Sequence, residues 1–123
     1  MKKGDIESDE YKKALALMTK ATREYGIDKV MNNNKLDAIM APTGSPAWKT
    51  DLLPGDHFTG GSSSLAAISG YPAITVPMGF IDNLPVGVTF FGRAWNEPLL
   101  LEIAYSYEQG TKHRKVPKYI VSD

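Results

Sequence analysis

The sequence contains no cysteine, which excludes disulfide bonds, thiolate metal sites and a cysteine nucleophile. This composition is typical of a reducing compartment, so we expect a cytoplasmic protein. A net charge is also lacking, because 14 lysine and arginine residues balance 14 aspartate and glutamate residues. No global field attracts nucleic acid or an anionic membrane, and we expect neither as a partner.

Long apolar runs are absent as well. No segment approaches the roughly 20 apolar residues that span a bilayer, and no apolar stretch follows Lys2 and Lys3 as in a signal peptide. No group of His, Asp and Glu residues has the spacing of metal ligands, and we expect no metal and no cofactor. The 123 residues suit one domain, which we place at 1–123 with flexible tails at 1–7 and 112–123.

Helical periodicity dominates the first part of the chain. Apolar residues recur on one stripe from Ser8 to Tyr25, which predicts an amphipathic helix with Ser8 as its N-cap. Gly26 is expected to end this helix in a left-handed conformation. Shorter helices are predicted at 28–33 and 62–69, and a last helix at 97–109, stopped by Gly110.

Three apolar segments, at 36–42, 71–80 and 86–92, predict strands. The last two are joined by a turn at 81–85, so we expect an antiparallel hairpin. The strands do not alternate cleanly with polar residues, and such strands need cover on both faces. The pattern predicts an α/β protein whose sheet is a piece of a wider one.

The segment 43–61 is rich in Gly, Pro, Ser and Thr and leads into the serine run Ser62–Ser64. Long loops of this kind are often functional. A serine nucleophile needs a base and oxyanion donors. Asp56 and His57 lie just before the serines, but catalytic triads are assembled from separated segments. We therefore interpret the serines as the capped start of a helix.

Several motifs occur in a recognisable order: "LDAIMAPTGSPAW", "ISGYPAITVPMGF" and "LPVGVTFFGRAWNEPLLLEIAYSYEQGT". Over about residues 11–111 the sequence resembles the C-terminal part of amidase signature enzymes. The resemblance implies a partial amidase-signature fold, with a short three-stranded β-sheet piece covered by helices. It also implies hydrolysis of carboxamide C–N bonds, and within the family the loop segments look most like members that act on peptides or small carboxamides.

The family's Ser–cis-Ser–Lys triad lies upstream of the region that matches, and no segment here matches its signature with the lysine. The resemblance thus implies no catalytic residue in this chain, which we expect to be inactive alone. It does imply substrate-pocket lining, by Thr43, Gly44, Ser45, Trp48, Asp56, Phe58 and Ser62. A small amide would bind only together with the missing catalytic half.

Other interpretations stay open from the sequence. The chain could be a non-catalytic module that associates with itself, or a truncated remnant. We expect a homo-oligomer or association with the N-terminal half of an amidase, because open strand edges invite partners. An autonomous serine hydrolase that uses Ser62 or Ser63 with His57 is the third interpretation.

Overall fold

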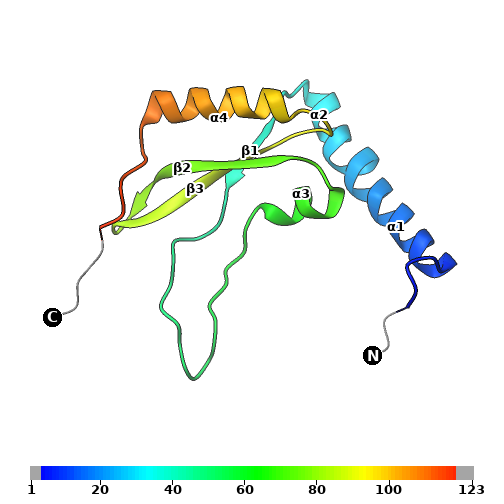
Figure 1. Cartoon of the computed structure of the whole chain (residues 1–123), viewed down its shortest axis with the longest axis horizontal. Helices are drawn as coiled ribbons and strands as arrows, with labels where there is room; N and C mark the ends of the chain where they lie inside the picture. The colour runs from blue at the N-terminus through cyan, green and yellow to red at the C-terminus, as the bar shows by residue number, and fades with distance from the viewer. Residues whose placement is uncertain (1–3, 119–123) are drawn as a thin grey trace.

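Figure 1 shows the computed structural model, which describes residues 4–118. The ends of the two predicted tails, residues 1–3 and 119–123, lie outside the described residues. The elements follow one another in the order α1 (Asp9–Thr22), η1 (Arg23–Ile27), α2 (Asp28–Asn34), β1 (Ile39–Pro42), α3 (Ser63–Ser69), β2 (Ala73–Ile81), β3 (Leu84–Phe91) and α4 (Glu97–Thr111). Within residues 4–118, no helix has both the length and the apolar character needed to cross a membrane.

The helix α1 begins as predicted, because the hydroxyl of Ser8 accepts a hydrogen bond from the Tyr11 N–H at 3.3 Å. The expected left-handed end at Gly26 is wrong. Gly26 has φ −104° and ψ −107° inside the π-helical turn η1, and the chain passes directly into α2. A Cβ at this position would lie 3.0 Å from the carbonyl oxygen of Ala21, so glycine is needed for close approach.

The three strands form one sheet in the order β1-β3-β2, with both outer strands antiparallel to β3. The predicted hairpin is confirmed, but its turn is shorter than 81–85. Asp82 and Asn83 have φ values of 50° and 66°, as a two-residue hairpin turn requires, and the strands extend to Ile81 and Leu84.

Helix α4 covers one face of the sheet (Figure 1). Its residues Leu100 and Ala104 are buried against Val88 and Phe90 of β3. The helix runs one residue past Gly110, the predicted stop, and ends where Lys112 adopts a left-handed φ of 50°. Here the helix interior tolerates the glycine, and a lysine takes the terminating conformation.

The opposite face of the sheet is covered at one end only. There Phe91 packs with Ile27, Met31 and Ala66 from η1, α2 and α3. On β2, Ala73, which pairs with Phe91, and Thr75, the next residue on this face, are both exposed. Helix α1 has no buried residue at all. The α/β class and the three-stranded sheet are confirmed, and the fold leaves apolar surface open on this side.

Candidate functional site

The loop between β1 and α3 extends away from the sheet as a long projection (Figure 1). Its two limbs run antiparallel and are bridged at the base between Gly44 and Gly61. A second bridge, between Asp51 and Gly55, closes the tip. The two bridges hold the loop in a defined conformation, although its sequence has neither helical nor strand periodicity. Glycine lets the two limbs approach closely because it has no side chain between them.

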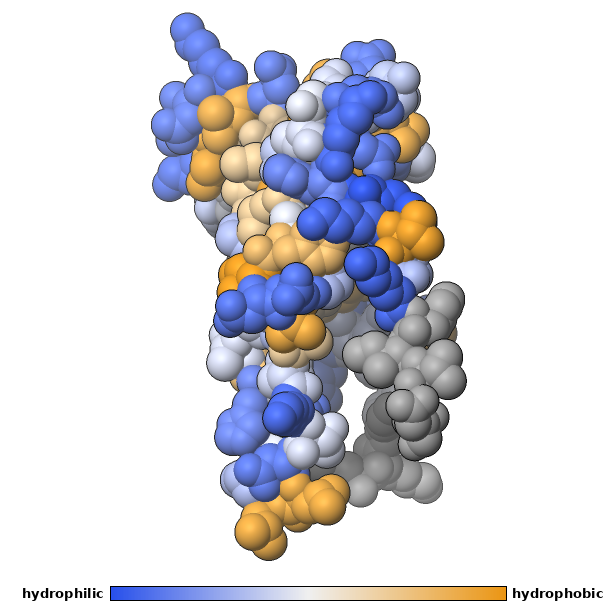
Figure 2. All heavy atoms as spheres, turned by 90° about the vertical axis from the view of Figure 1, so that its left-hand side faces the viewer, coloured by the Kyte–Doolittle hydropathy of each residue, from blue (hydrophilic) through white to orange (hydrophobic). Residues whose placement is uncertain are grey.

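The tip of the loop presents leucine side chains to solvent. Leu52 and Leu53 are 94% and 97% exposed, and hydrophobic atoms form the lower end of the molecule in Figure 2. The carboxylate of Asp51 accepts a hydrogen bond from the Leu53 N–H at 2.9 Å, which fixes the turn.

At the base of the loop, three threonine hydroxyls form a chain on the open face of the sheet. Thr89 of β3 is buried, and its hydroxyl lies 2.7 Å from that of Thr43 and 2.9 Å from that of Thr75. The backbone N–H of Thr43 also donates to the Gly87 carbonyl at 2.8 Å. Hydroxyls both donate and accept, so this group can pair with both ends of a carboxamide.

Gly87 makes this arrangement possible. A Cβ at position 87 would lie 2.8 Å from the Thr43 hydroxyl oxygen and 2.9 Å from a methyl carbon of Thr75. Gly61 has a similar role across the loop, since its Cβ would lie 2.8 Å from the Thr43 carbonyl oxygen. Both glycines therefore act through close approach of the backbone.

Ser62 lies beside this threonine chain. Its N–H donates to the Thr43 carbonyl at 3.1 Å. Ser62 occupies the N-cap position of α3, as predicted, but its side chain makes no capping hydrogen bond. Its Oγ is buried and has no hydrogen-bond partner among the described residues.

A second group of predicted pocket residues lies between the base of the loop and its tip. The indole N–H of Trp48 donates to Oδ1 of Asp56 at 2.7 Å, from one limb to the other. The rings of Trp48 and Phe58 are tilted by 54°, with centroids 6.1 Å apart. Ser45 lies between the two groups, exposed and with no side-chain hydrogen bond to the part of the chain described.

His57 is close to Asp51, with 3.8 Å between Nε2 and Oδ2, and makes no hydrogen bond to Ser62 in residues 4–118. The described residues also hold no group of three or more His, Asp or Glu side chains that could bind a metal ion. The loop therefore offers hydroxyls, a carboxylate and aromatic rings for binding, and no paired nucleophile and base.

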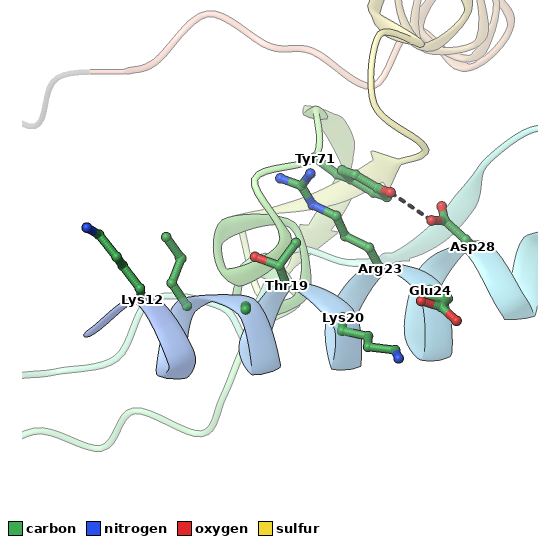
Figure 3. Close-up of a pocket in the computed structure, with 9 residues that line it drawn as sticks. Lys12, Thr19, Lys20, Arg23, Glu24, Asp28 and Tyr71 are labelled. Carbon is green, nitrogen blue, oxygen red and sulfur yellow. Dashed lines mark hydrogen bonds between the residues drawn. The ribbon is translucent and has the colours of Figure 1, made fainter. Parts of the chain in front are cut away.

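A separate groove runs along α1 (Figure 3) and was not predicted from the sequence. The Arg23 guanidinium donates to the Ser69 carbonyl at 2.7 Å. It lies over the ring of Tyr71, 5.1 Å from the ring centroid. These partners are 46 residues apart or more, and no local pattern reveals such a pairing.

The hydroxyl of Tyr71 donates to Oδ2 of Asp28 at 2.8 Å (Figure 3). Burial, followed by this hydrogen bond and the charge of Asp28, raises the pKa of Tyr71 above its usual value of 10.0. The other oxygen of Asp28 is buried and has no partner among the described residues. These contacts join η1 and α2 to the segment just before β2, at one end of the groove.

Known proteins match nearly all of this chain. The family model described as Amidase matches residues 1–101. A probable amidase of Arabidopsis thaliana is 42% identical over 110 residues, which are 89% of this chain and 18% of the relative. A glutamyl-tRNA(Gln) amidotransferase subunit of Methanosarcina barkeri is 36% identical over 87% of this chain and 23% of its own.

Solved structures agree with these sequence matches. A peptide amidase in complex with the inhibitor chymostatin has a TM-score of 0.88 and 44% identity, over 95% of this chain and 24% of its own. The native peptide amidase of Stenotrophomonas maltophilia has a TM-score of 0.85 and 41% identity, over 97% of this chain and 24% of its own. The chain spans less than a quarter of the length of these relatives. The extent of the family match, together with the shared fold, shows that the chain belongs to the amidase family.

Proposed function

We propose that this chain acts as the C-terminal portion of an amidase that hydrolyses carboxamide C–N bonds. The observation that carries the proposal is the match to peptide amidase, at 44% identity over 95% of this chain but 24% of the enzyme. In the mechanism that the resemblance implies, a serine of the remainder attacks the amide carbonyl and water releases the acid from the acyl-enzyme. This chain would supply part of the sheet and one wall of the substrate pocket.

The base of the loop supports the role as a pocket wall. Thr43, Gly44 and Ser62 meet near the exposed Thr75, on the open face of the sheet but beyond the end where η1, α2 and α3 pack on Phe91. A carboxamide needs a donor for its oxygen and acceptors for its nitrogen, and the hydroxyl chain has both. Trp48, Asp56 and Phe58 then form the outer part of this wall.

The same geometry supports our expectation that the chain alone is inactive. A serine attacks an amide only when a neighbouring group takes its proton. The Ser62 hydroxyl has no such partner among the described residues. We therefore assign no catalytic residue here.

The exposed apolar side chains of α1 support association of this chain with another polypeptide. The stripe of α1 is exposed at Tyr11, Leu15 and Met18, by 42–45%. The remainder of an amidase is the occupant that we propose. Self-association is the second candidate, since the same apolar side chains could pair two copies. We place the protein in the cytoplasm, on the lack of cysteine.

The test is a chimera in which this chain replaces the matching segment of the Stenotrophomonas maltophilia peptide amidase. Ammonia release from peptide amides is then measured. We expect the chimera to be active, and both the peptide amidase without that segment and this chain alone to be inactive.

Two results would contradict the proposal. A well-folded chimera with no turnover would mean that this chain cannot complete an amidase pocket. Turnover by the chain alone that Ser62→Ala abolishes would place the nucleophile here. Light scattering on the chain alone separates the second candidate, because a clean monomer excludes stable self-association.

A further inference from the structure

We propose that Trp48, Asp56 and Phe58 form a subsite for a cationic group of the substrate, so that amides with an ammonium or guanidinium group are preferred. This inference rests on the proposed function, because it assigns a ligand class to the outer wall of the same pocket. The three side chains come from both limbs of the loop and meet between the bridge at its base and the bridge at its tip.

The carboxylate of Asp56 is oriented but not neutralised. The indole N–H of Trp48 binds Oδ1 at 2.7 Å, which leaves Oδ2 available as an acceptor. In residues 4–118, no Lys, Arg or His nitrogen lies within ion-pair distance of Asp56. A fixed carboxylate without a cation of its own binds a charged N–H donor more strongly than a neutral one.

The two rings add attraction for the same kind of group. Trp48 and Phe58 are 39% and 69% exposed, so a ligand can reach them, and their planes are inclined at 54°. The faces of aromatic rings attract cations within about 6 Å of the centroid. A carboxylate beside inclined rings therefore favours a cation with an apolar stem, which can lie along the rings.

Other charges near Trp48 set the size of the effect. Lys49, Asp51 and His57 line the neighbouring hollow with Trp48. The two carboxylates of Asp51 and Asp56 outnumber the single ammonium group of Lys49. The site is open to water and screened, so we expect a preference of about three- to tenfold for a cationic ligand.

The rest of the amide pocket needs the catalytic half, but all three side chains of this subsite belong to the chain itself. The experiment therefore uses the purified chain and two probes that differ only in the group that the subsite would bind, N-acetyl-lysinamide and N-acetyl-norleucinamide. Binding is followed by heteronuclear NMR on the indole N–H signals. We expect N-acetyl-lysinamide to shift the Trp48 signal with about three- to tenfold higher affinity. Trp95 is an internal reference, since it is 86% exposed and distant in sequence, and its signal should not move.

Two variants and one control define the source of the preference. Asp56→Asn keeps an oxygen to accept the indole bond and removes the charge, so the two probes should bind equally. Phe58→Leu should weaken N-acetyl-lysinamide about twofold while Asp56 stays in place. Asp82→Asn, in the hairpin turn where Asn is well tolerated, should leave the preference unchanged.

Equal affinity for the two probes in the natural chain would overturn the inference, as would the absence of any shift at Trp48. A preference that survives Asp56→Asn would also overturn it. These results are independent of turnover, because the chain is tested without a catalytic half. A chimera that is active but does not prefer cationic amides would contradict only this inference. An inactive chimera, with the cationic preference of the chain intact, would contradict only the proposed function.

Discussion

Gly87 and Thr43 approach so closely that the missing side chain at position 87 shapes the base of the loop. The contact distances leave no room for even one carbon atom between the Thr43 hydroxyl and the Thr75 methyl. The residue is partly buried in β3, where glycine otherwise weakens a strand. Its presence there is explained by the threonine hydroxyl chain rather than by a turn.

Gly87→Ala should therefore destabilise the protein by about 1–3 kcal/mol, in the range of overpacked positions. Equilibrium urea denaturation measures the change. Gly110→Ala is the matched control, because nothing lies within 4 Å of its Cβ position. Since Gly110 lies within α4, the control should stabilise by about 0.5–1 kcal/mol. Stabilisation by Gly87→Ala, of the kind expected for Gly110→Ala, would refute the close contact at Gly87.

Tyr71 gives a second prediction for a single residue. Its pKa is raised in the folded chain, mainly by burial and by Asp28, so the folded state holds the phenolic proton more firmly than the unfolded state does. This contribution to stability is complete below pH 10 and is lost as the pH rises through the folded pKa. Ultraviolet titration should show a tyrosine that ionises later than the others, and Asp28→Asn should bring its pKa down. An unchanged curve would contradict the role of Asp28.

Two helices end at a lysine in the left-handed conformation. Helix α2 ends at Lys35, which has a left-handed φ of 51°, and α4 ends at Lys112 in the same conformation. A left-handed lysine carries a steric cost that glycine avoids. Both termini therefore hold strain that a substitution can release.

Lys35→Gly should stabilise the chain by about 0.5–1 kcal/mol. Lys29→Gly, inside α2, is the control and should destabilise by a similar amount, because glycine is a poor helix former. Thermal unfolding followed by circular dichroism compares the two. Destabilisation by Lys35→Gly would show that the lysine side chain supports the helix end by contacts of its own.

Most of the helices and strands could be predicted from the sequence, because helical and strand periodicity are local signals. They locate the helices, the three strands and the hairpin. Local rules fail at Gly26 and Gly110, where glycine predicts a helix stop. In the structure a carbonyl packs against Gly26, and a lysine ends α4. Close approach between distant atoms decides such positions, and the sequence does not display it.

The candidate site was predictable in part. Family resemblance locates the residues of the loop base and of the Trp48 group. Their division into two groups depends on which limbs face each other, and no sequence pattern fixes that. Thr75 and Thr89 were missed because a threonine in a strand is ordinary by composition. Only the strand register brings their hydroxyls into line with Thr43.

For the molecule as a whole, the exposed apolar side chains of α1, which include Leu17 beside the stripe, predict a difference between the isolated chain and the peptide amidase chimera. Leu17 is 72% exposed, so Leu17→Glu should change the stability of the chain alone by less than about 0.5 kcal/mol. In the peptide amidase chimera, the same change should lower the melting temperature and the yield of active enzyme, because α1 would then be covered. Gln109→Glu on α4 is the control. An unaffected chimera would show that this side of α1 stays in solvent.

The loop tip also determines how the chain would respond to a protease. Leu52 and Leu53 are almost fully exposed, and cleavage of the peptide bond between them would interrupt no helix or strand. The first product would carry α1, η1, α2 and β1, and the second would carry α3, β2, β3 and α4. Because β1 pairs with β3, and Phe91 packs on Ile27 and Met31, the two products would share one sheet and one core. Limited proteolysis would thus yield a nicked chain that stays together under native conditions and separates only when unfolded.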